Sequence, residues 1–299
     1  MTPIVLVSTL IANVLTGTIK QNNEEQTMFS AIALSLLGFA STVIGSLHYF
    51  LKVKKNKPPK NPIILMLALA AGVLLGLGAI ISGIINMHWS FVFVVLMSSF
   101  SIFLGGKFIW VFSQKDTPLG DIKVVIGDKF PQFESTTYDN EIYSADDIKN
   151  QRVLLKFYRG AWCPYCSAEL KMFNDMKPTL DRYGVKVVAL SGDTAEQAKM
   201  HIERDSLDFL LLSDPELKVV KQYGVEHHKA LGADSSKTKT VLGLPFPTSF
   251  EYKSMSIPTS VLIDEHGVIQ WIDQSEDYRL RASEERLTQA LRNAFTINK

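Results

Sequence analysis

The sequence is poor in cysteine. Among its 299 residues, Cys163 and Cys166 are the only two, and both lie in the segment KFYRGAWCPYCSAEL. A tetrahedral zinc site needs four ligands. The polar part of the chain adds four histidines without zinc-finger spacing: His201, His227, His228 and His266. A structural zinc site is therefore disfavoured, and no cofactor is implied.

Charged residues are scarce in the first third of the chain. Of 31 basic residues only seven precede Ser113, and of 30 acidic residues only Glu24 and Glu25 do. The rest of the chain carries 24 basic and 28 acidic residues, which makes it a mildly acidic body without a basic stripe. Nucleic acid is therefore not expected as a partner.

Two long stretches, residues 30–51 and 62–106, contain no Asp, Glu, Lys or Arg. About 20 apolar residues cross a bilayer as a helix, so the first stretch predicts one span. The second is roughly twice that length and must fold back. Its polar interruption NMHW, residues 86–89, predicts the turn, so we expect two further spans at residues 62–85 and 90–112.

The region before the first span is a weaker candidate for a fourth one. Residues 2–19 are apolar but contain several hydroxyl and amide side chains. They lack the basic start and the small-residue cleavage site of a signal peptide. The all-helical membrane region, residues 1–113, is thus predicted to hold three or four helices.

Lysines predict the orientation of these spans. The loop LKVKKNKPPKN, residues 51–61, holds five of the seven basic residues in this region, whereas the predicted loop after Ile19 sets Lys20 against two glutamates. Short loops rich in lysine stay cytoplasmic. Two spans follow this loop, so the polar part of the chain is expected in the cytoplasm, on an integral multi-pass membrane protein; the inverted topology is the alternative.

After a linker, residues 114–122, strands and helices alternate over residues 123–299. Buried-strand patterns lie at 152–157, 185–191, 209–212, 257–264 and 268–273, and helical patterns lie at 167–183 with a kink at Pro178, 195–205, 215–224 and 282–295. Residues 225–256 are predicted to be a long irregular loop. Alternation that ends in a hairpin and a helix predicts one three-layer α/β domain with a mixed sheet.

The two cysteines lie where the strand 152–157 ends and a helix begins. The partial positive charge of a helix N-terminus favours a thiolate, so the pKa of Cys163 is predicted to be lowered. Cys166 follows one turn later on the same face, within reach of a disulfide. The pair can therefore attack a disulfide and resolve the mixed intermediate; simple burial of two unreactive thiols is the alternative.

The chain resembles the alkyl hydroperoxide reductase/thiol-specific antioxidant branch of the thioredoxin-fold superfamily, of the peroxiredoxin-like type that carries C-x-x-C. The resemblance rests on GDKFPQFEST, FYRGAWCPYC, VVALSGD, LLLSDPELKVVKQYGV and IPTSVLIDEHG. It covers essentially the whole of residues 123–299 and leaves the apolar region out. It implies a thioredoxin-like three-layer sandwich.

The sequence also departs from this family's peroxidase pattern. The threonine that stands three residues before the peroxidatic cysteine is replaced by Cys163, which places the peroxidatic position at Cys166. The arginine that polarises the peroxide at the start of a late strand is replaced by Pro258. Trp-Cys-x-x-Cys and this proline resemble thioredoxin instead, where the proline is cis and shapes a groove for substrate.

We therefore expect a membrane-anchored thiol-disulfide oxidoreductase with Cys163 as attacking thiolate, Cys166 as resolving thiol and Pro258 as groove-forming cis proline. Two alternatives stay open. One is an antioxidant thiol peroxidase in which Cys166 is peroxidatic and Cys163 resolves. The other is a non-catalytic redox sensor in the membrane. The expected partners are protein dithiols or disulfides, or hydroperoxides, a thioredoxin-type electron donor and the lipid bilayer.

Overall fold

A computed structural model describes residues 3–84, 89–119 and 122–295 of the chain. It divides the protein into two compact units. One unit comprises Met1–Tyr49 and Asn61–Ser113, and the other comprises Phe50–Lys60 and Gln114–Lys299. The loop rich in lysine is thus grouped with the second unit.

The first unit is helical. Its helices are α1 (Pro3–Lys54), of which the residues after Tyr49 are grouped with the second unit, α2 (Ile63–Ile84) and α3 (Phe91–Ser113). Three segments of the described residues are long and apolar enough to cross a bilayer, namely Gln26–Lys54, Ile63–Ile84 and Phe91–Ser113. The expected helices are therefore confirmed. Trp89 and Ser90 form a turn before α3, while residues 86–88 of the predicted turn lie outside the described residues.

The loop predicted after Ile19 is wrong. The backbone stays helical without a break from Pro3 to Lys54, a helix of 52 residues. The polar stretch KQNNEEQ, residues 20–26, contains neither glycine nor proline, so nothing in its backbone chemistry ends the helix. Residues 3–19 therefore belong to the same helix as the first predicted span.

Two glycines let α2 pack closely inside this unit. A Cβ added to Gly72 would lie 3.0 Å from the carbonyl oxygen of Gly38 on α1, and one added to Gly76 would lie 3.3 Å from that of Ser98 on α3. These contacts are tighter than ordinary packing allows, so both positions need a residue without a side chain.

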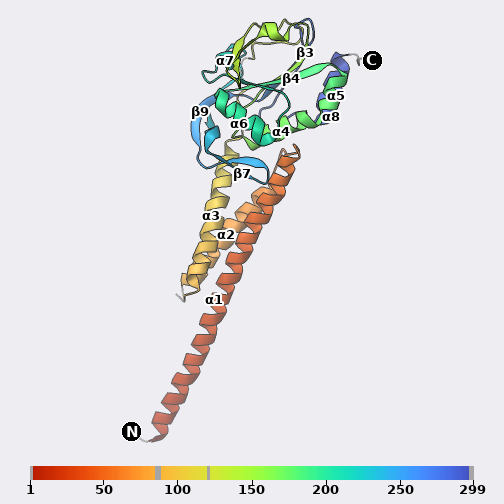
Figure 1. Ribbon diagram of the computed structural model, residues 1–299. Coiled ribbons are helices and arrows are strands. Elements are labelled where there is room, and N and C mark those ends of the chain that lie inside the picture. The colour runs from red at the N-terminus through yellow and green to blue at the C-terminus, as the bar shows by residue number, and fades with distance from the viewer. Residues whose placement is uncertain (1–2, 85–88, 120–121, 296–299) are drawn as a thin grey trace. The chain divides into compact units, whose positions relative to one another are not determined.

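The second unit is built on a seven-stranded mixed sheet in the order β11-β10-β3-β4-β5-β1-β2. Strands β3 and β4 of this sheet are labelled in Figure 1. Its strands are β1 (Glu134–Thr137), β2 (Ile142–Ser144), β3 (Arg152–Phe157), β4 (Val185–Ser191), β5 (Leu210–Ser213), β10 (Thr259–Ile263) and β11 (Ile269–Gln274). The central strands β3, β4 and β5 are parallel, and the other pairs are antiparallel. This order confirms the predicted mixed sheet.

Alternate residues of β3 face opposite layers, as a strand requires. Val153, Leu155 and Phe157 belong to an apolar cluster that includes Phe130 and Tyr223. On the opposite face Lys156 contacts a residue of α4. The helices are α4 (Pro164–Asp175), α5 (Lys177–Arg182), α6 (Ala195–Asp205), α7 (Lys218–Gln222) and α8 (Glu284–Ala294), with short 3-10 turns η1 (Ala145–Ile148) and η2 (Ser235–Lys237).

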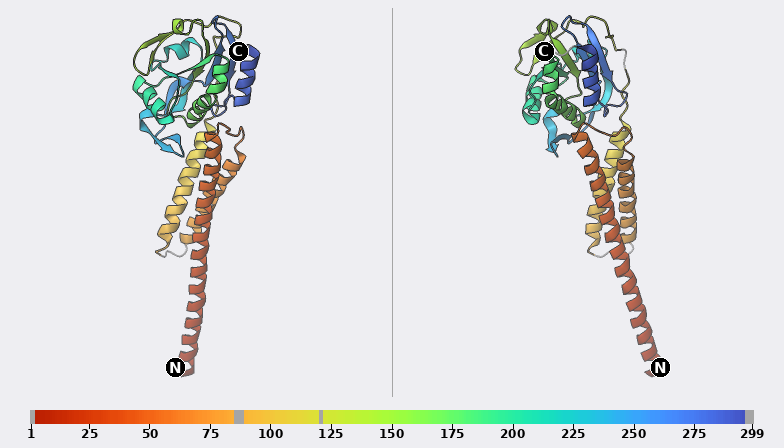
Figure 2. Two further views of the ribbon diagram at one scale, coloured as in Figure 1. Left: turned by 45° about the vertical axis from the view of Figure 1, so that its right-hand side comes forward. Right: turned by 90° about the vertical axis from the view of Figure 1, so that its right-hand side faces the viewer.

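The layers follow from this alternation. Right-handed crossovers between parallel β3, β4 and β5 place α4, α5 and α6 on one face of the sheet. The C-terminal helix α8 lies beside α5 in the different views of Figures 1 and 2. Residues 124–133 and α7 contribute to the apolar cluster that covers the other face of the sheet. The predicted three-layer α/β sandwich is therefore confirmed.

The irregular loop predicted for residues 225–256 is wrong. This segment, called the arm below, forms two small sheets in which β6 (Glu226–Gly232) pairs with β9 (Glu251–Ser256) and β7 (Thr238–Val241) pairs with β8 (Leu244–Pro247). Leu242 and Gly243 close the inner hairpin with positive φ angles of 54° and 76°. Such a two-residue turn usually shows an Asn-Gly or Asp-Gly signature, so leucine at its first position hid the hairpin.

Candidate active site

A sharp bend after β3 brings the chain to the two cysteines. Gly160 has a φ of 140°, and a Cβ there would lie 2.8 Å from the ring of Trp162 and 3.0 Å from Asp193. The buried carboxylate of Asp193 accepts a 2.7 Å hydrogen bond from the backbone N–H of Ala161. Only glycine fits this bend, which is held by a side chain from the loop after β4.

Cys163 is the N-cap of α4, with Pro164 at the first helical position and Cys166 in the first turn. Proline is well suited there because that position has no helical partner for an N–H. Both thiols are free and their residues have 0% of their surface exposed. The dithiol therefore sits below the protein surface at the start of a helix.

Arg281, between β11 and α8, reaches Cys166. Its Nη2 lies 3.5 Å from the Cys166 sulfur. Its Nε lies 2.8 Å from a carboxylate oxygen of Glu169, an ion pair in which the N–H is not aligned as a hydrogen bond. The arginine side chain is 2% exposed. A buried positive charge is thus held against one of the two sulfurs.

Glu169 connects this arginine to the sheet. Its carboxylate is fully buried and accepts a 2.7 Å hydrogen bond from the Nζ of Lys156 on β3. The same ammonium donates to the hydroxyl of Ser260 on β10, at 3.1 Å. Burial raises the pKa of Glu169, and the charges of Lys156 and Arg281 oppose that rise. The three charges form one network beside the dithiol.

The two thiols differ in acidity. Burial raises the pKa of the Cys166 thiol, but the hydrogen bond from Cys163 and the charge of Arg281 outweigh burial and bring this pKa well below its usual range. Burial, followed by the interaction with Cys166, raises the pKa of Cys163 well above its usual range. The prediction of a lowered pKa at Cys163 is therefore wrong, because local charges outweigh the helix N-terminus. These directions favour a thiolate at Cys166 rather than at Cys163.

Arg159 is a second buried cation near the dithiol. Its guanidinium lies 4.8 Å from the ring centre of Trp162 and 4.0 Å from that of Tyr278. It donates a 2.6 Å hydrogen bond to the carbonyl oxygen of Leu231 in the arm. Although it lies just after the end of a strand, the residue is not a solvated surface charge, since only 5% of it is exposed. Arg159 thus contacts both the arm and Trp162 beside the dithiol.

Pro258 lies at the same end of the sheet. It is buried and comes directly before β10, whose Thr259 pairs with Phe157 at the end of β3. The predicted cis bond before Pro258 is wrong, because the described residues contain no cis peptide bond. The chain runs from β9 into β10 without a tight turn, so nothing here opposes the usual trans preference.

The residues that sequence reasoning missed are Lys156, Glu169 and Arg281. Glu169 is a fully buried carboxylate, which its position in a helical sequence pattern does not reveal. A signal was present in RVLLKF, because a lysine inside an apolar strand requires a buried counter-charge. No local signal identifies Arg281, which lies 115 residues from Cys166 in the chain.

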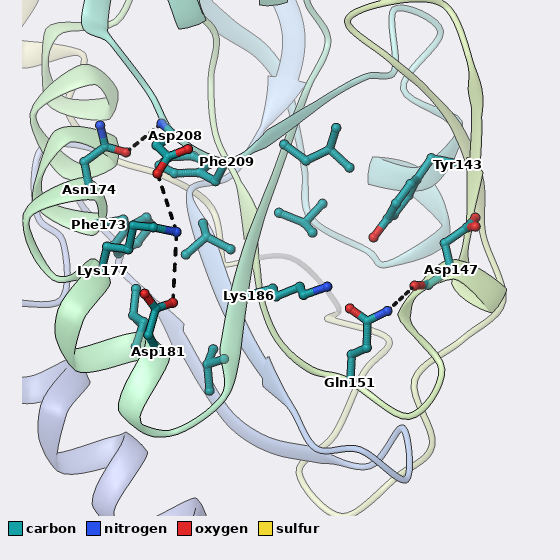
Figure 3. A pocket seen from close by; sticks show the side chains of 15 residues that line it. Tyr143, Asp147, Gln151, Phe173, Asn174, Lys177, Asp181, Lys186, Asp208 and Phe209 are labelled. Atoms are coloured by element: carbon teal, nitrogen blue, oxygen red, sulfur yellow. Dashed lines mark hydrogen bonds and ion pairs between the residues drawn. The ribbon is translucent and has the colours of Figure 1, made fainter. Parts of the chain in front are cut away.

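A separate cavity of about 430 Å³ lies away from the dithiol (Figure 3). It is lined by the start of β4 at Val185 and of β5 at Leu210, whereas the dithiol follows the end of the parallel strand β3. Lys177 bridges Asp181 and Asp208 on one wall. No cysteine lines this cavity, which lies at the opposite end of the parallel strands from the dithiol.

Comparison with known proteins agrees with the fold. The family model described as the AhpC/TSA family matches residues 126–272. The putative peroxiredoxin bcp of Coxiella burnetii is 32% identical over 149 residues, which is 50% of this chain and 87% of the relative. The chain belongs to the AhpC/TSA family. The resemblance inferred from its motifs is confirmed.

Two further proteins are similar to this AhpC/TSA chain. The thiol-disulfide oxidoreductase ResA of Bacillus thuringiensis subsp. konkukian is 29% identical over 164 residues, covering 52% of this chain and 78% of the relative. The crystal structure of peroxidoxin BcpB from Mycobacterium tuberculosis has 21% identity and a TM-score of 0.43, covering 57% and 96% of the two chains. The prediction that the domain is an oxidoreductase enzyme is confirmed by the named relatives.

Proposed function

We propose that the domain is a thiol peroxidase in which Cys166 is the peroxidatic cysteine and Cys163 the resolving one. The observation that carries this proposal is the Arg281 guanidinium 3.5 Å from the Cys166 sulfur, beside a thiol whose pKa is well below its usual range. The thiolate is the nucleophile in peroxide chemistry. Of the two catalytic assignments left open by the sequence, this geometry favours the one that begins at Cys166.

The reaction is a two-electron oxidation followed by internal disulfide formation. The Cys166 thiolate attacks one oxygen of a hydroperoxide, forming an S–O bond and breaking the O–O bond. The alkoxide or hydroxide leaves and takes up a proton, and Cys166 becomes a sulfenic acid. The Cys163 sulfur then attacks the Cys166 sulfur, forming the disulfide and releasing water. A thioredoxin-type dithiol returns both thiols to the reduced state and is itself oxidised to a disulfide.

Arg281 takes the place of the polarising arginine that Pro258 replaces. Its charge would stabilise the thiolate 3.5 Å away and the negative charge that develops on the departing oxygen. Glu169 and Lys156 hold the arginine in place from the other side. The threonine position remains occupied by Cys163, so the peroxide lacks that hydroxyl donor, and turnover is expected to be slower than with a complete peroxidase site.

Thiol-disulfide exchange is the second candidate function. The contact between Cys163 and Cys166 within the first turn of α4 favours it, because such a pair forms and breaks a disulfide without unwinding the helix. Against it, both residues are 0% exposed. A protein disulfide needs a far larger opening than a hydroperoxide does. A trans bond at Pro258 also removes the predicted reason for a substrate groove there.

Stopped-flow fluorescence of the full reduced chain decides between the two, because Trp162 adjoins the dithiol and reports its oxidation. We expect hydrogen peroxide to oxidise the dithiol much faster than an equal concentration of a protein disulfide. A faster reaction with the protein disulfide would contradict the peroxidase proposal. The Cys163→Ser/Cys166→Ser double variant is the control for fluorescence changes unrelated to the dithiol.

We further propose that the three apolar helices anchor the domain in a bilayer and that the domain faces the cytoplasm. Their length and composition support the anchor, and the five lysines of residues 51–61 support the orientation. A reporter active only outside the cytoplasm, fused after Lys299, should be inactive. Strong activity of that reporter would reverse the proposed orientation.

A further inference from the structure

The segment that supplies Arg281 is bound to the linker that leaves α3. The segment, called the strap below, consists of residues 275–282 between β11 and α8. Thr117 donates its backbone N–H to Glu276 at 2.8 Å and its hydroxyl to the Ser275 carbonyl at 2.5 Å. Tyr278 donates its N–H to the Lys115 carbonyl at 3.1 Å. The linker therefore pairs with one side of the strap like a short strand.

The other side of the strap faces the dithiol. The carbonyl oxygens of Tyr278 and Leu280 both accept hydrogen bonds from Nη1 of Arg281, the second at 2.8 Å. The remaining nitrogens of that guanidinium face Cys166 and Glu169. The backbone of the strap thus makes two kinds of contact. The N–H of Tyr278 contacts the linker, and the carbonyl oxygens of Tyr278 and Leu280 orient Arg281.

The strap also contacts Lys60, the last residue of the stretch 50–60 of the second unit. Arg279 is 1% exposed and forms a 2.6 Å ion pair with Asp277 inside the strap. The same guanidinium donates a 3.2 Å hydrogen bond to the carbonyl oxygen of Lys60. Lys60 precedes α2, and Lys115 follows α3. Both chain segments that connect the α2–α3 hairpin to the second unit therefore hold the strap.

We infer that these two segments, through the contact of Thr117 with Ser275 and that of Lys60 with Arg279, are positioning elements of the active site. They hold the strap in the conformation that keeps Arg281 against Cys166, so the reactivity of Cys166 depends on the chain that enters and leaves the helical hairpin. A displacement of the linker moves the acceptors at Tyr278 and Leu280 and loosens the contact of Arg281 with the thiolate. The inference rests on the proposed role of Arg281 in the peroxidase.

Thr117→Val tests the inference because it removes the hydroxyl contact and keeps the shape of the side chain. The loss of one hydrogen bond usually changes the equilibrium constant of the conformation that it stabilises by between about twofold and tenfold. We expect a raised pKa of Cys166 in the full-length chain and a peroxide reaction slower by about that factor below the new pKa. At higher pH the difference should shrink, which a general loss of folded protein would not produce.

Thr248→Val is the matched control, since the Thr248 hydroxyl also donates to a backbone carbonyl, that of Lys237, at 3.1 Å. It should leave the Cys166 pKa unchanged. Arg279→Gln should repeat the effect of Thr117→Val, with the melting temperature recorded beside the pKa. If Thr117→Val and Arg279→Gln both match the control, the inference is overturned.

Arg281→Gln separates this inference from the proposed function. If Arg281→Gln raises the Cys166 pKa while Thr117→Val and Arg279→Gln do not, the positioning role fails and the peroxidase proposal stands. If none of the three variants changes that pKa, both fail. A rise in all three, largest in Arg281→Gln, supports both.

Discussion

Replacing Arg281 with glutamine should raise the pKa of Cys166 and slow its reaction with hydroperoxide. Two unit charges 3.5 Å apart interact by about 5 kcal/mol at an effective dielectric constant of 20. Glu169, of opposite sign and 2.8 Å from the arginine, cancels part of this stabilisation of the thiolate. An opposite charge at such a distance usually lowers a pKa by about 1–3 units. We therefore expect a rise in this range, equivalent to about 1.4–4 kcal/mol.

The assay is the ultraviolet absorbance of the thiolate as a function of pH, measured in a Cys163→Ser background so that one thiol titrates. Arg182→Gln, the same substitution at an exposed arginine of α5, is the control and should leave the titration unchanged. Because Arg281→Gln leaves Glu169 with less counter-charge, the double variant Arg281→Gln/Glu169→Gln is measured as well. An unchanged Cys166 titration in both variants would refute the electrostatic account of this site.

Three further predictions concern the acidity of Cys166, the bend at Gly160 and the titration of His227. Because the pKa of Cys166 is lowered, the rate of its reaction with peroxide should be constant around neutral pH and should fall only when acid protonates the thiolate. Stopped-flow rates measure this. A rate that already falls as the pH drops through about 8.5, the ordinary cysteine pKa, would contradict it. Gly160→Ala should lower the unfolding free energy by about 1–3 kcal/mol in thermal or denaturant unfolding, whereas Gly78→Ala, with open space around its Cβ, should not. Burial and the charge of Arg159 lower the pKa of His227 to about 4. Between about pH 6.5 and 4 the unfolded chain therefore binds a proton at this residue that the native chain does not, so the free energy of unfolding should decrease as the pH is lowered through this window. His227→Gln should flatten that slope, and His266→Gln, at an exposed position, should not.

Regular apolar patterns predicted the scaffold of the domain well. Strands β3 and β4 and helix α6 have the predicted bounds, and the chain breaks between α4 and α5 next to Pro178, because local periodicity and proline chemistry govern these elements. Strands β1 and β2 escaped prediction. Their sequences ESTT and IYS are short, and they are strands only because they pair with each other and with β5.

The site was only half predictable for a related reason. The two cysteines could be identified from their spacing and from their position between a strand and a helix. Which sulfur is the thiolate depends on Arg281 and Glu169, and their meeting is a product of tertiary structure. The helix N-terminus was a correct local influence on Cys163, but a full charge beside Cys166 exceeds a partial charge at a helix end.

The most direct test of the central claim is to find which sulfur reacts first with peroxide. One equivalent of hydrogen peroxide is added to the reduced full-length Cys163→Ser and Cys166→Ser variants, and sulfenic acid is measured by intact mass after trapping with a specific reagent. The account predicts rapid formation of sulfenic acid at Cys166 in Cys163→Ser and little at Cys163 in Cys166→Ser. Rapid oxidation of Cys163 in Cys166→Ser, with an inert Cys166 in the other variant, would contradict it.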